Sequence, residues 1–536
     1  MSSTDSQSSL IDLFSTIAEN HPDCPAFTFL DCNLNASSYT YRQLWKAVKE
    51  VAGRITRLGF IKKTPIGILL QSQESQVIHY LAVISAGLVP AILTPPNRKL
   101  KPEIFKKTIA SLVECCCFSA IISDANALSA DVTLLAPETL EILHHSRRQA
   151  NPIENTAILQ FTSGTTGIKR GVQISHGAML RSMRVYADAI KLGRSDTILS
   201  WLPLYHDMGF IACLNMPLAF GVHCIMIHPL DWVANPTLFI QASSLYHATL
   251  SWNPNFAYAF MAERVDQEQL IDVDLSSLRG LVNCAEPVTV ESQQRFKTRF
   301  AGYGLKCNIF RGCYAMAETT FALTDGQETD SSYLDFLGPT ESDLLVKLPQ
   351  ISVGRALPDV ELAVMDENNR HVSDRELGEI WVRSPLLFSG YYNNPAATSE
   401  AMQQNWYKTG DIGYRIGQEY YVCSRKKDLL ILNGVNIFPQ DVEELVASVE
   451  GVIAGRVVAF SEFNEQFQSE VLIVLAESNV PAHEINAVII RIRQAILAQF
   501  QVAGFSVYIL PPHWLVKSSS GKIARHTNKA KWLAER

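Results

Sequence analysis

The sequence predicts an α/β protein with a large N-terminal domain of layered α/β subdomains and a small, mobile α+β domain at the C-terminus. Two observations indicate the layered part: short apolar runs alternate with stretches of helical spacing from residue 10 to residue 123, and several runs are apolar throughout, as in buried parallel strands. The third observation is the length of 536 residues, which is long for one hydrophobic core and favours two or more domains.

The N-terminal elements follow in order along the chain. Helices are expected over 10–20, from Tyr41 onward and over 75–85. Strands are expected over 26–30, 66–70, 89–93 and 120–123. A strand, a helix and a further strand at this spacing indicate a layered α/β sheet, which binds ligands at the ends of its strands.

The stretch 158–172 predicts a polyphosphate-binding loop. An apolar run that is typical of a buried strand leads into hydroxyl-bearing and glycine residues, followed by two cations: Thr162, Ser163, Gly164, Thr165, Thr166, Gly167, Lys169 and Arg170. Glycines let backbone N–H groups approach phosphate oxygens, hydroxyls donate hydrogen bonds, and cations neutralise charge. The Walker A spacing is absent. The alternative interpretation is a plain turn between a strand and a helix.

Composition excludes several classes of protein. A net charge of −7 disfavours a sequence-independent nucleic-acid binder, so no nucleic-acid partner is expected. The first residues show no secretory signal, and the longest apolar stretch, 210–227, carries Asn215, Pro217, Gly221 and His223. These breakers favour a strand–turn–strand inside a core over an integral membrane segment. The eleven cysteines suit neither a disulfide framework nor a metal site, and we expect buried, reduced thiols in a cytoplasmic protein.

Polar residues that follow apolar runs are candidates for the site. His206 and Asp207 lie between Pro203 and Gly209 and could position a carboxylate substrate, although an isolated pair of this kind is more often structural. The stretch 247–258 predicts a strand that enters a helix, with aromatic residues in a core or along a pocket wall.

The second half of the large domain adds three more candidates. Tyr314 and Glu318 lie in a predicted strand-to-helix turn, where Tyr314 could stack on a base and Glu318 could hold Mg²⁺ or serve as an acid in the first turn of a helix. Asp411 follows a tight turn and could accept hydrogen bonds from ribose, or could be an ordinary turn aspartate. The polar, acidic stretch 327–349 is expected to be a surface insertion.

The domain boundary is expected near residue 427. A charged stretch changes abruptly there to an apolar one, which divides the chain into 1–426 and 427–536. The smaller part has strands expected over 455–461 and 470–476 and helices over 441–448 and 482–499. It ends in a Ser/Gly turn with Lys522, which is either part of a basic loop or a lysine delivered to a carboxylate or phosphate.

Taken in order, the motifs at 159–172, 201–209, 314–319, 407–413, 424–443 and 518–525 resemble those of the AMP-forming adenylate superfamily, which includes acyl-CoA synthetases, luciferases and non-ribosomal peptide adenylation domains. The resemblance covers residues 39–525 and implies an acyl-adenylate synthetase-like fold and a two-step reaction. ATP and a carboxylic acid give acyl-AMP and pyrophosphate, and an acceptor then takes the acyl group.

The resemblance also implies roles for individual residues. Thr162 to Gly167 would bind the ATP phosphates and Glu318 would hold Mg²⁺. Ala285, Glu286 and Tyr314 would surround adenine, and Asp411 and Arg425 would bind ribose. Lys522 would bridge the carboxylate and the α-phosphate, His206 would lie at the acyl pocket, and Lys427 would be the hinge about which the C-terminal domain swings.

Three positions depart from the family pattern. Arg170 stands where the family has lysine, which keeps the charge but changes its geometry. Ala315 and Ala317 replace a glycine and a threonine, and Thr319 would partly supply the lost hydroxyl.

Within the superfamily, the stretches 201–209, 254–258, 317–318 and 436–443 are similar to those of fatty-acyl-AMP ligases, which pass the acyl group to the phosphopantetheine arm of an acyl carrier protein. Two alternatives stay open: an acyl-CoA synthetase that uses free CoA, and a non-catalytic nucleotide-binding member of the fold.

Overall fold

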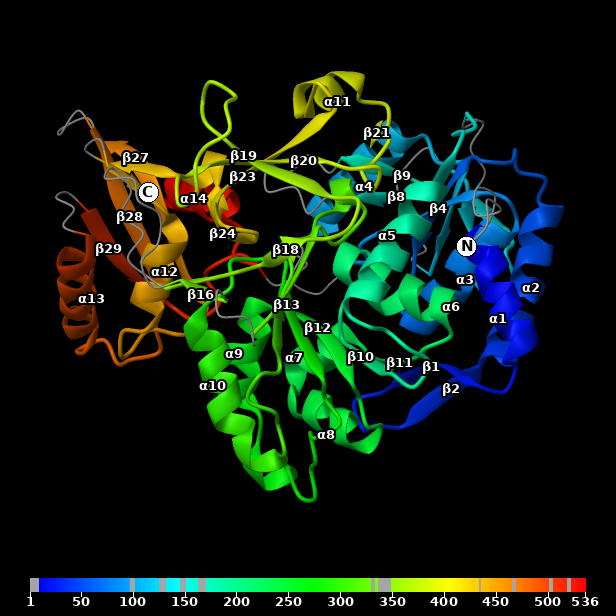
Figure 1. Cartoon of the computed structure of the whole chain (residues 1–536), viewed down its shortest axis with the longest axis horizontal. Helices are drawn as coiled ribbons and strands as arrows, with labels where there is room; N and C mark the ends of the chain where they lie inside the picture. Colours follow the sequence, from blue (N-terminus) through cyan, green and yellow to red (C-terminus); the bar gives the residue numbers. More distant parts are fainter. Residues whose placement is uncertain are drawn as a thin grey trace.

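The computed structural model describes residues 9–96, 102–124, 132–144, 151–161, 170–328, 333–335, 349–432, 435–464, 469–500, 505–517 and 522–536. A large part with several sheets and surrounding helices makes up most of the molecule, and a smaller α+β part, orange to red in Figure 1, lies at one end. The predicted fold class is confirmed.

The main sheet has a parallel half that carries much of the site. Its parallel strands are, in spatial order, β14 (Phe310–Gly312), β13 (Gly280–Cys284), β12 (Leu250–Pro254), β10 (Thr197–Ser200), β11 (His223–Ile227) and β1 (Pro25–Leu30). Strand β2 (Ala36–Thr40) closes the edge antiparallel to β1. Strand β13 is buried along its whole length, as expected for a parallel strand covered on both faces. Because these strands run parallel, the residues after them meet at one edge of the sheet.

The same sheet continues as an antiparallel half. Its strands are β15 (Thr324–Gln327), β18 (Gly354–Ala356), β24 (Glu419–Arg425), β23 (Trp406–Ile416), β20 (Gly378–Arg383) and β19 (Glu361–Met365), with the short β22 (Met402–Gln403) beside β23. Asp411 pairs with Arg425 in the register of β23 and β24. The expectation that Asp411 simply follows a turn was incomplete, because it lies inside a long strand.

A second sheet confirms the predicted layers at the N-terminus. It contains β4 (Val89–Ile92), β3 (Pro65–Leu69), β5 (Ala120–Ser123), β6 (Leu134–Leu135) and β7 (Ile142–His144). Ile66 and Ile68 pack into one core with residues of α2 (Tyr41–Arg57) and α3 (Gln73–Ser85), whereas Leu69 packs into another with residues of α4 (Pro102–Cys116). Helix α2 begins where the sequence predicts, since Thr40 and Gln43 form a capping box. Helix α1 spans Leu10–Asn20, also as predicted.

The strand before the predicted phosphate loop belongs to a third, small sheet. Strand β8 (Thr156–Phe161) pairs antiparallel with β9 (Gly171–Ser175), which pairs with β21 (Gly390–Tyr391). A strand therefore follows the loop directly, rather than the helix of the alternative interpretation, and α5 (His176–Ala189) begins only after β9. Residues 162–169 lie outside the described part of the chain.

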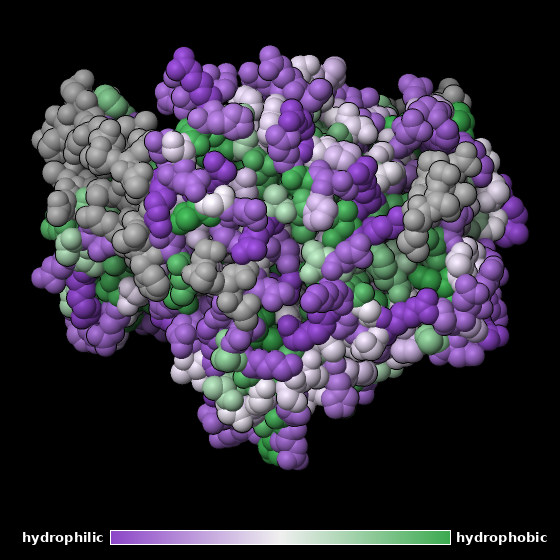
Figure 2. All heavy atoms as spheres, in the orientation of Figure 1, coloured by the Kyte–Doolittle hydropathy of each residue, from purple (hydrophilic) through white to green (hydrophobic). Residues whose placement is uncertain are grey.

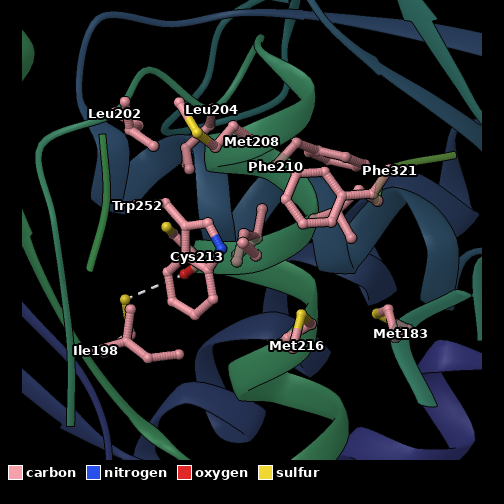
Figure 3. Packing of buried hydrophobic residues seen from close by; sticks show 14 of the residues in the cluster. Met183, Ile198, Leu202, Leu204, Met208, Phe210, Cys213, Met216, Trp252 and Phe321 are labelled. Atoms are coloured by element: carbon pink, nitrogen blue, oxygen red, sulfur yellow. Dashed lines mark hydrogen bonds between the residues drawn. The ribbon is translucent and has the colours of Figure 1, made fainter. Parts of the chain in front are cut away.

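The prediction of a strand–turn–strand over 210–227 was wrong in its first half. A π-helical turn, η1 (Met208–Asn215), continues into α6 (Met216–Phe220), and only then does β11 begin. Figure 3 shows Met208, Phe210, Cys213 and Met216 along this helix, with Ile198 and Trp252 from neighbouring strands. Every residue of η1 is buried. A helix that is apolar on all sides has no amphipathic period, so a short apolar run cannot be distinguished from a strand.

The remaining helices of the large part are α7 (Pro229–Ala234), α8 (Thr237–Leu245), α9 (Asn255–Arg264), α10 (Val290–Phe300) and α11 (Pro395–Ala401). The strand and helix expected over 247–258 are β12 and α9. None of the described helices combines the length and apolar character that a membrane crossing requires. The face seen in Figure 2 is mainly hydrophilic, with apolar residues in small patches.

Two further expectations need correction. The described residues of the acidic stretch 327–349 do not all lie on the surface: Tyr333 and Asp335 are buried, and β16 (Leu334–Asp335) pairs with β17 (Gln350–Ile351). Asp335 bonds Arg375 and the Tyr414 hydroxyl, which explains its burial. All eleven cysteines are free, but Cys24, Cys32 and Cys307 are exposed.

The C-terminal part has its own sheet and cores. Its elements are β25 (Leu430–Leu432), β26 (Val435–Ile437), α12 (Pro439–Ala447), β27 (Val457–Asn464), β28 (Ser469–Glu477), α13 (Ile485–Phe500), β29 (Phe505–Leu510) and α14 (Arg525–Glu535). Strand β28 pairs with β27 on one side and β29 on the other. The short helical turn η5 (Lys426–Asp428) precedes this part. The boundary and hinge near residue 427 stay predictions.

Candidate active site

The site lies where the parallel strands β10, β13 and β14 end. His206 follows β10, Ala285 and Glu286 follow β13, and Tyr314 follows β14. The C-terminal ends of parallel strands lie at the same edge of a sheet, so residues far apart in the sequence come together here.

His206 and Asp207 are joined by a side-chain hydrogen bond at this edge. His206 Nδ1 and Asp207 Oδ1 lie 3.1 Å apart, and Asp207 Oδ1 also accepts from the Met208 N–H at 2.9 Å. Burial alone would raise the pKa of Asp207, but the hydrogen bond and charge of His206, together with the charge of Lys522, hold it below its usual value. Asp207 is therefore an anion that keeps the imidazole in one orientation.

Aromatic side chains gather beside the same loop. The Trp201 and Trp232 rings stack at 3.5 Å between centroids, and Phe256 packs edge-on against both. Trp201 Nε1 donates to Asn253 Oδ1 at 2.6 Å, which satisfies its polar atom in the core. The surroundings of the 201–209 loop are thus largely apolar.

Ala285 and Glu286 occupy the turn after β13. Ala285 has φ 76°, in the left-handed region that residues with a side chain rarely adopt. Glu286 Oε1 accepts from the Phe256 N–H at 2.6 Å. Burial raises the pKa of Glu286, and the hydrogen bond from Phe256 and the charge of Lys522 oppose that rise. The carboxylate therefore joins the turn to the start of α9.

Tyr314, Asp411 and Arg425 form one connected group. The resemblance implies that all three contact the nucleotide, and that role stays a prediction. The Tyr314 hydroxyl donates to Asp411 Oδ2 at 2.6 Å, and Arg425 Nε lies 3.0 Å from Asp411 Oδ1. Asp411 is buried, and its charge raises the pKa of Arg425. This carboxylate is thus fixed by two partners, Arg425 of β24 and Tyr314 of the turn after β14.

Glu318 lies in a single helical turn, η4 (Ala317–Thr319), before β15 rather than in the longer helix that the sequence predicted. Its Oε1 accepts from the Tyr391 hydroxyl at 2.8 Å. Burial raises the pKa of Glu318, while Tyr391 and the charge of Arg425 act in the opposite direction. The Arg170 guanidinium lies 5.1 Å from the centre of the Tyr391 ring.

The donor set around Glu318 fits Mg²⁺ that arrives with a nucleotide. Among the described residues, no group of three or more His, Cys, Asp or Glu side chains is arranged to hold a metal ion. The protein would therefore supply one carboxylate, that of Glu318. Mg²⁺ beside phosphates is commonly bound by one or two carboxylates, water and the phosphates themselves.

Thr319 is not brought to this site. It is fully buried, and its hydroxyl lies 2.7 Å from the Phe321 carbonyl oxygen and 3.0 Å from that of Met316. Its single proton is therefore engaged by the backbone. The loop residues Thr162 to Gly167 lie outside the described residues, so their role stays a prediction.

Lys522 reaches this edge from the C-terminal part. Its Nζ donates to the carbonyl oxygen of Ala285, and its charge acts on both Asp207 and Glu286. Lys517 of the same segment lies over the Phe256 ring at 5.3 Å. The C-terminal part is thus oriented with Lys522 at the ends of β10 and β13.

The sequence reasoning missed Tyr391 and did not single out Phe388. The residues around them, Ser389-Gly-Tyr-Tyr-Asn-Asn-Pro395, form a Gly/Asn/Pro turn that looks like an ordinary loop. Aromatic residues next to a glycine in such a turn were the available signal.

Comparison with known proteins identifies the family to which this chain belongs. The family described as "AMP-binding enzyme" matches residues 14–392. A Caulobacter vibrioides protein named as a candidate acyl-CoA synthetase is 29% identical, over 92% of this chain and 90% of its own. A Moorena producens medium-chain-fatty-acid–[acyl-carrier-protein] ligase is 25% identical, over 98% and 95%. A structure from a study of fatty acyl-adenylate ligases of E. coli and L. pneumophila has a TM-score of 0.86 at 26% identity, covering 99% of this chain and 98% of that one. With most of its length matched and its fold shared, this chain belongs to the AMP-binding enzyme family.

Proposed function

We propose that the protein activates a fatty acid with ATP to give acyl-AMP and pyrophosphate, and then transfers the acyl group to the phosphopantetheine thiol of an acyl carrier protein. One observation carries the proposal: Lys522 lies at the turn after β13, on the same edge as the Tyr314–Asp411–Arg425 group and Glu318. This position supports a role for the Lys522 cation between a carboxylate and a nucleotide.

The first step joins two anions. A carboxylate oxygen of the acid attacks the α-phosphorus of ATP, the bond from that phosphorus to the bridging oxygen breaks, and pyrophosphate leaves. Lys522 neutralises both reactants, which repel each other without a cation between them.

Asp411 and Arg425 hold the ribose, and Ala285, Glu286 and Tyr314 surround the adenine. Glu318 is the residue that would hold Mg²⁺, which supplies charge neutralisation to the phosphates when bound.

The second step moves the acyl group to sulfur. The deprotonated thiol attacks the carbonyl carbon of acyl-AMP, the bond from that carbon to the phosphate oxygen breaks, and AMP leaves. His206, which is hydrogen-bonded to Asp207, would lie at the acyl end of the site. This step requires Lys522 to withdraw, so the C-terminal part swings about a hinge near Lys427.

The apolar surroundings of the 201–209 loop support a fatty acid as the substrate. Trp201 belongs to this loop, and Trp232 and Phe256 pack against its ring. Moving an alkyl chain from water to apolar surroundings lowers its free energy. A substrate acid with a charged substituent would instead lose the solvation of that charge. The carrier ligase from M. producens and the fatty acyl-adenylate ligase structure support the same assignment.

The competing function is transfer to free CoA. The candidate acyl-CoA synthetase of C. vibrioides favours it, because the match covers 92% of this chain and 90% of that protein. A third function, nucleotide binding without catalysis, has support only from Arg170 and Ala317.

Product analysis separates these functions. Purified protein is incubated with ATP, Mg²⁺ and acids from acetate to long-chain fatty acids, with CoA and separately with a phosphopantetheinylated carrier protein, and products are resolved by mass. We expect acyl-AMP to persist beside CoA and to be consumed by the carrier. Rapid formation of acyl-CoA would overturn the choice of acceptor. ATP binding without ATP–pyrophosphate exchange for any acid would overturn catalysis altogether.

A further inference from the structure

Glu318 is held by a segment distant in the sequence. The Phe388 N–H donates to the Glu318 carbonyl oxygen at 2.8 Å, and the Thr320 hydroxyl donates to the Leu386 carbonyl oxygen at 2.7 Å. The Tyr391 hydroxyl then donates to Glu318 Oε1. Backbone and side chain of Glu318 are therefore both fixed by residues 386–391.

Tyr391 is itself rigidly placed. It is 6% exposed, its ring packs on Phe388 at 4.9 Å between centroids, and its N–H donates to the Thr398 hydroxyl at 2.9 Å. In the small sheet it pairs with Val172 of β9, the strand that begins one residue after Arg170. The tyrosine thus connects the strand that follows the predicted phosphate loop to the carboxylate predicted to hold the metal.

Arg170 covers the ring of the same tyrosine. Its guanidinium lies 5.1 Å from the ring centre. A planar guanidinium can stack on an aromatic face, which a lysine ammonium cannot do. This contact accounts for arginine at a position where lysine was expected.

We propose that Tyr391 is a positioning residue for Glu318, and that Arg170 acts on the metal carboxylate through Tyr391. This inference rests on the proposed function. The hydroxyl fixes the plane of the carboxylate through Oε1 and thereby sets the direction of Oε2. Residues that orient a metal-binding carboxylate in this way typically change metal affinity about 10–100-fold when removed.

The test compares Mg²⁺-dependent nucleotide binding in matched variants. Tyr391→Phe removes only the hydroxyl. Tyr392→Phe is the control, because Tyr392 is the next residue in the chain and packs with Cys116 and Phe161 in a different core. ATP binding is measured by calorimetry in EDTA and across a Mg²⁺ titration, and Mn²⁺ binding to the ATP complex is followed by electron paramagnetic resonance.

We expect all three proteins to bind ATP equally in EDTA. Tyr391→Phe should then need about 10–100-fold more Mg²⁺ to reach the tighter binding of the wild type. Wild-type Mg²⁺ dependence in Tyr391→Phe would overturn the proposal. This binding assay needs no carboxylic acid substrate. If the protein formed no acyl-AMP, the proposed function would be wrong, but the binding assay would still test the role of Tyr391.

Arg170→Lys is a second variant that cannot disturb the core, because Arg170 is exposed. It should shift the Mg²⁺ requirement in the same direction by a smaller factor. In the double variant with Tyr391→Phe, the Arg170 substitution should add little, because its route to Glu318 is already cut. Fully additive effects, or weaker ATP binding of Arg170→Lys in EDTA, would mean that Arg170 acts on the phosphates directly and would overturn its part of the proposal.

Discussion

Arg525 Nη1 lies 3.0 Å from Asp428 Oδ2, which joins the segment that carries Lys522 to the turn predicted as the hinge. The same guanidinium bonds both oxygens of Glu443, at 2.8 and 2.9 Å, and its Nε donates to the Ala459 carbonyl oxygen. One arginine therefore links α12, β27 and η5 at the base of the C-terminal part.

Removal of Arg525 should destabilise this part strongly. In Arg525→Met, Asp428 and Glu443 are left as buried carboxylates without their cation, which costs about 3–5 kcal/mol. Hydrogen exchange of peptides from 435–536 should show faster opening, while the sheets of the large part are unchanged. Arg525→Lys keeps the charge but loses the forked geometry, so its exchange rate should lie between those of wild type and Arg525→Met. Equal exchange in wild type and Arg525→Met would contradict this role.

Lys522→Ala should abolish adenylation and leave ATP binding intact, because the lysine is proposed to act where the carboxylate meets the α-phosphate. ATP–pyrophosphate exchange measures the first property, and calorimetry with ATP measures the second. Lys306→Ala, at an exposed lysine, is the control and should behave as wild type. If Lys522→Ala still catalysed exchange, the lysine would have been assigned wrongly.

Asp411→Asn should weaken nucleotide binding by about 10–100-fold, since a hydrogen bond to a charged group contributes roughly 1.5–3 kcal/mol. Tyr314→Phe removes one neutral donor and should cost less. The loss should be the same for ATP and AMP, because the ribose is common to both, whereas inhibition by pyrophosphate should not change. A loss confined to ATP would place Asp411 at the phosphates instead.

Asp441 should make the stability of the protein depend on pH. Burial raises its pKa from 3.8 to about 8, and its Oδ2 has no hydrogen-bond partner among the residues that the structure describes. Between these pH values the folded protein binds a proton that the unfolded chain releases, so the free energy of unfolding falls as pH rises from about 4 to about 8. Each unit of the shift corresponds to roughly 1.4 kcal/mol.

The measurement for Asp441 is the melting temperature from pH 4 to pH 9. Asp441→Asn should be more stable than wild type at the alkaline end, and the difference should shrink toward pH 4. Glu367→Gln, at an exposed carboxylate, should run parallel to wild type. Parallel curves for Asp441→Asn and wild type would show that this carboxyl is ionised in the folded protein.

Patterns within one element were sufficient to predict much of the fold. The helix Leu10–Asn20 and the start of α2 at Tyr41 follow from periodicity and a capping box, which depend on residues a few positions apart. The same reasoning failed over 210–227, where η1 is buried on all sides and periodicity carries no information.

The sequence by itself determined the family of motifs, the candidate residues and the two-part organisation, because each rests on residue types at short spacing. Only the tertiary structure decided which of them meet: Tyr391 bonds Glu318 across 73 positions, and Lys522 reaches Ala285 across 237. It also decided that the Thr319 hydroxyl is engaged by the backbone. Local spacing specifies how a segment folds, but a contact between distant segments depends on how whole sheets pack and which polar groups they bury.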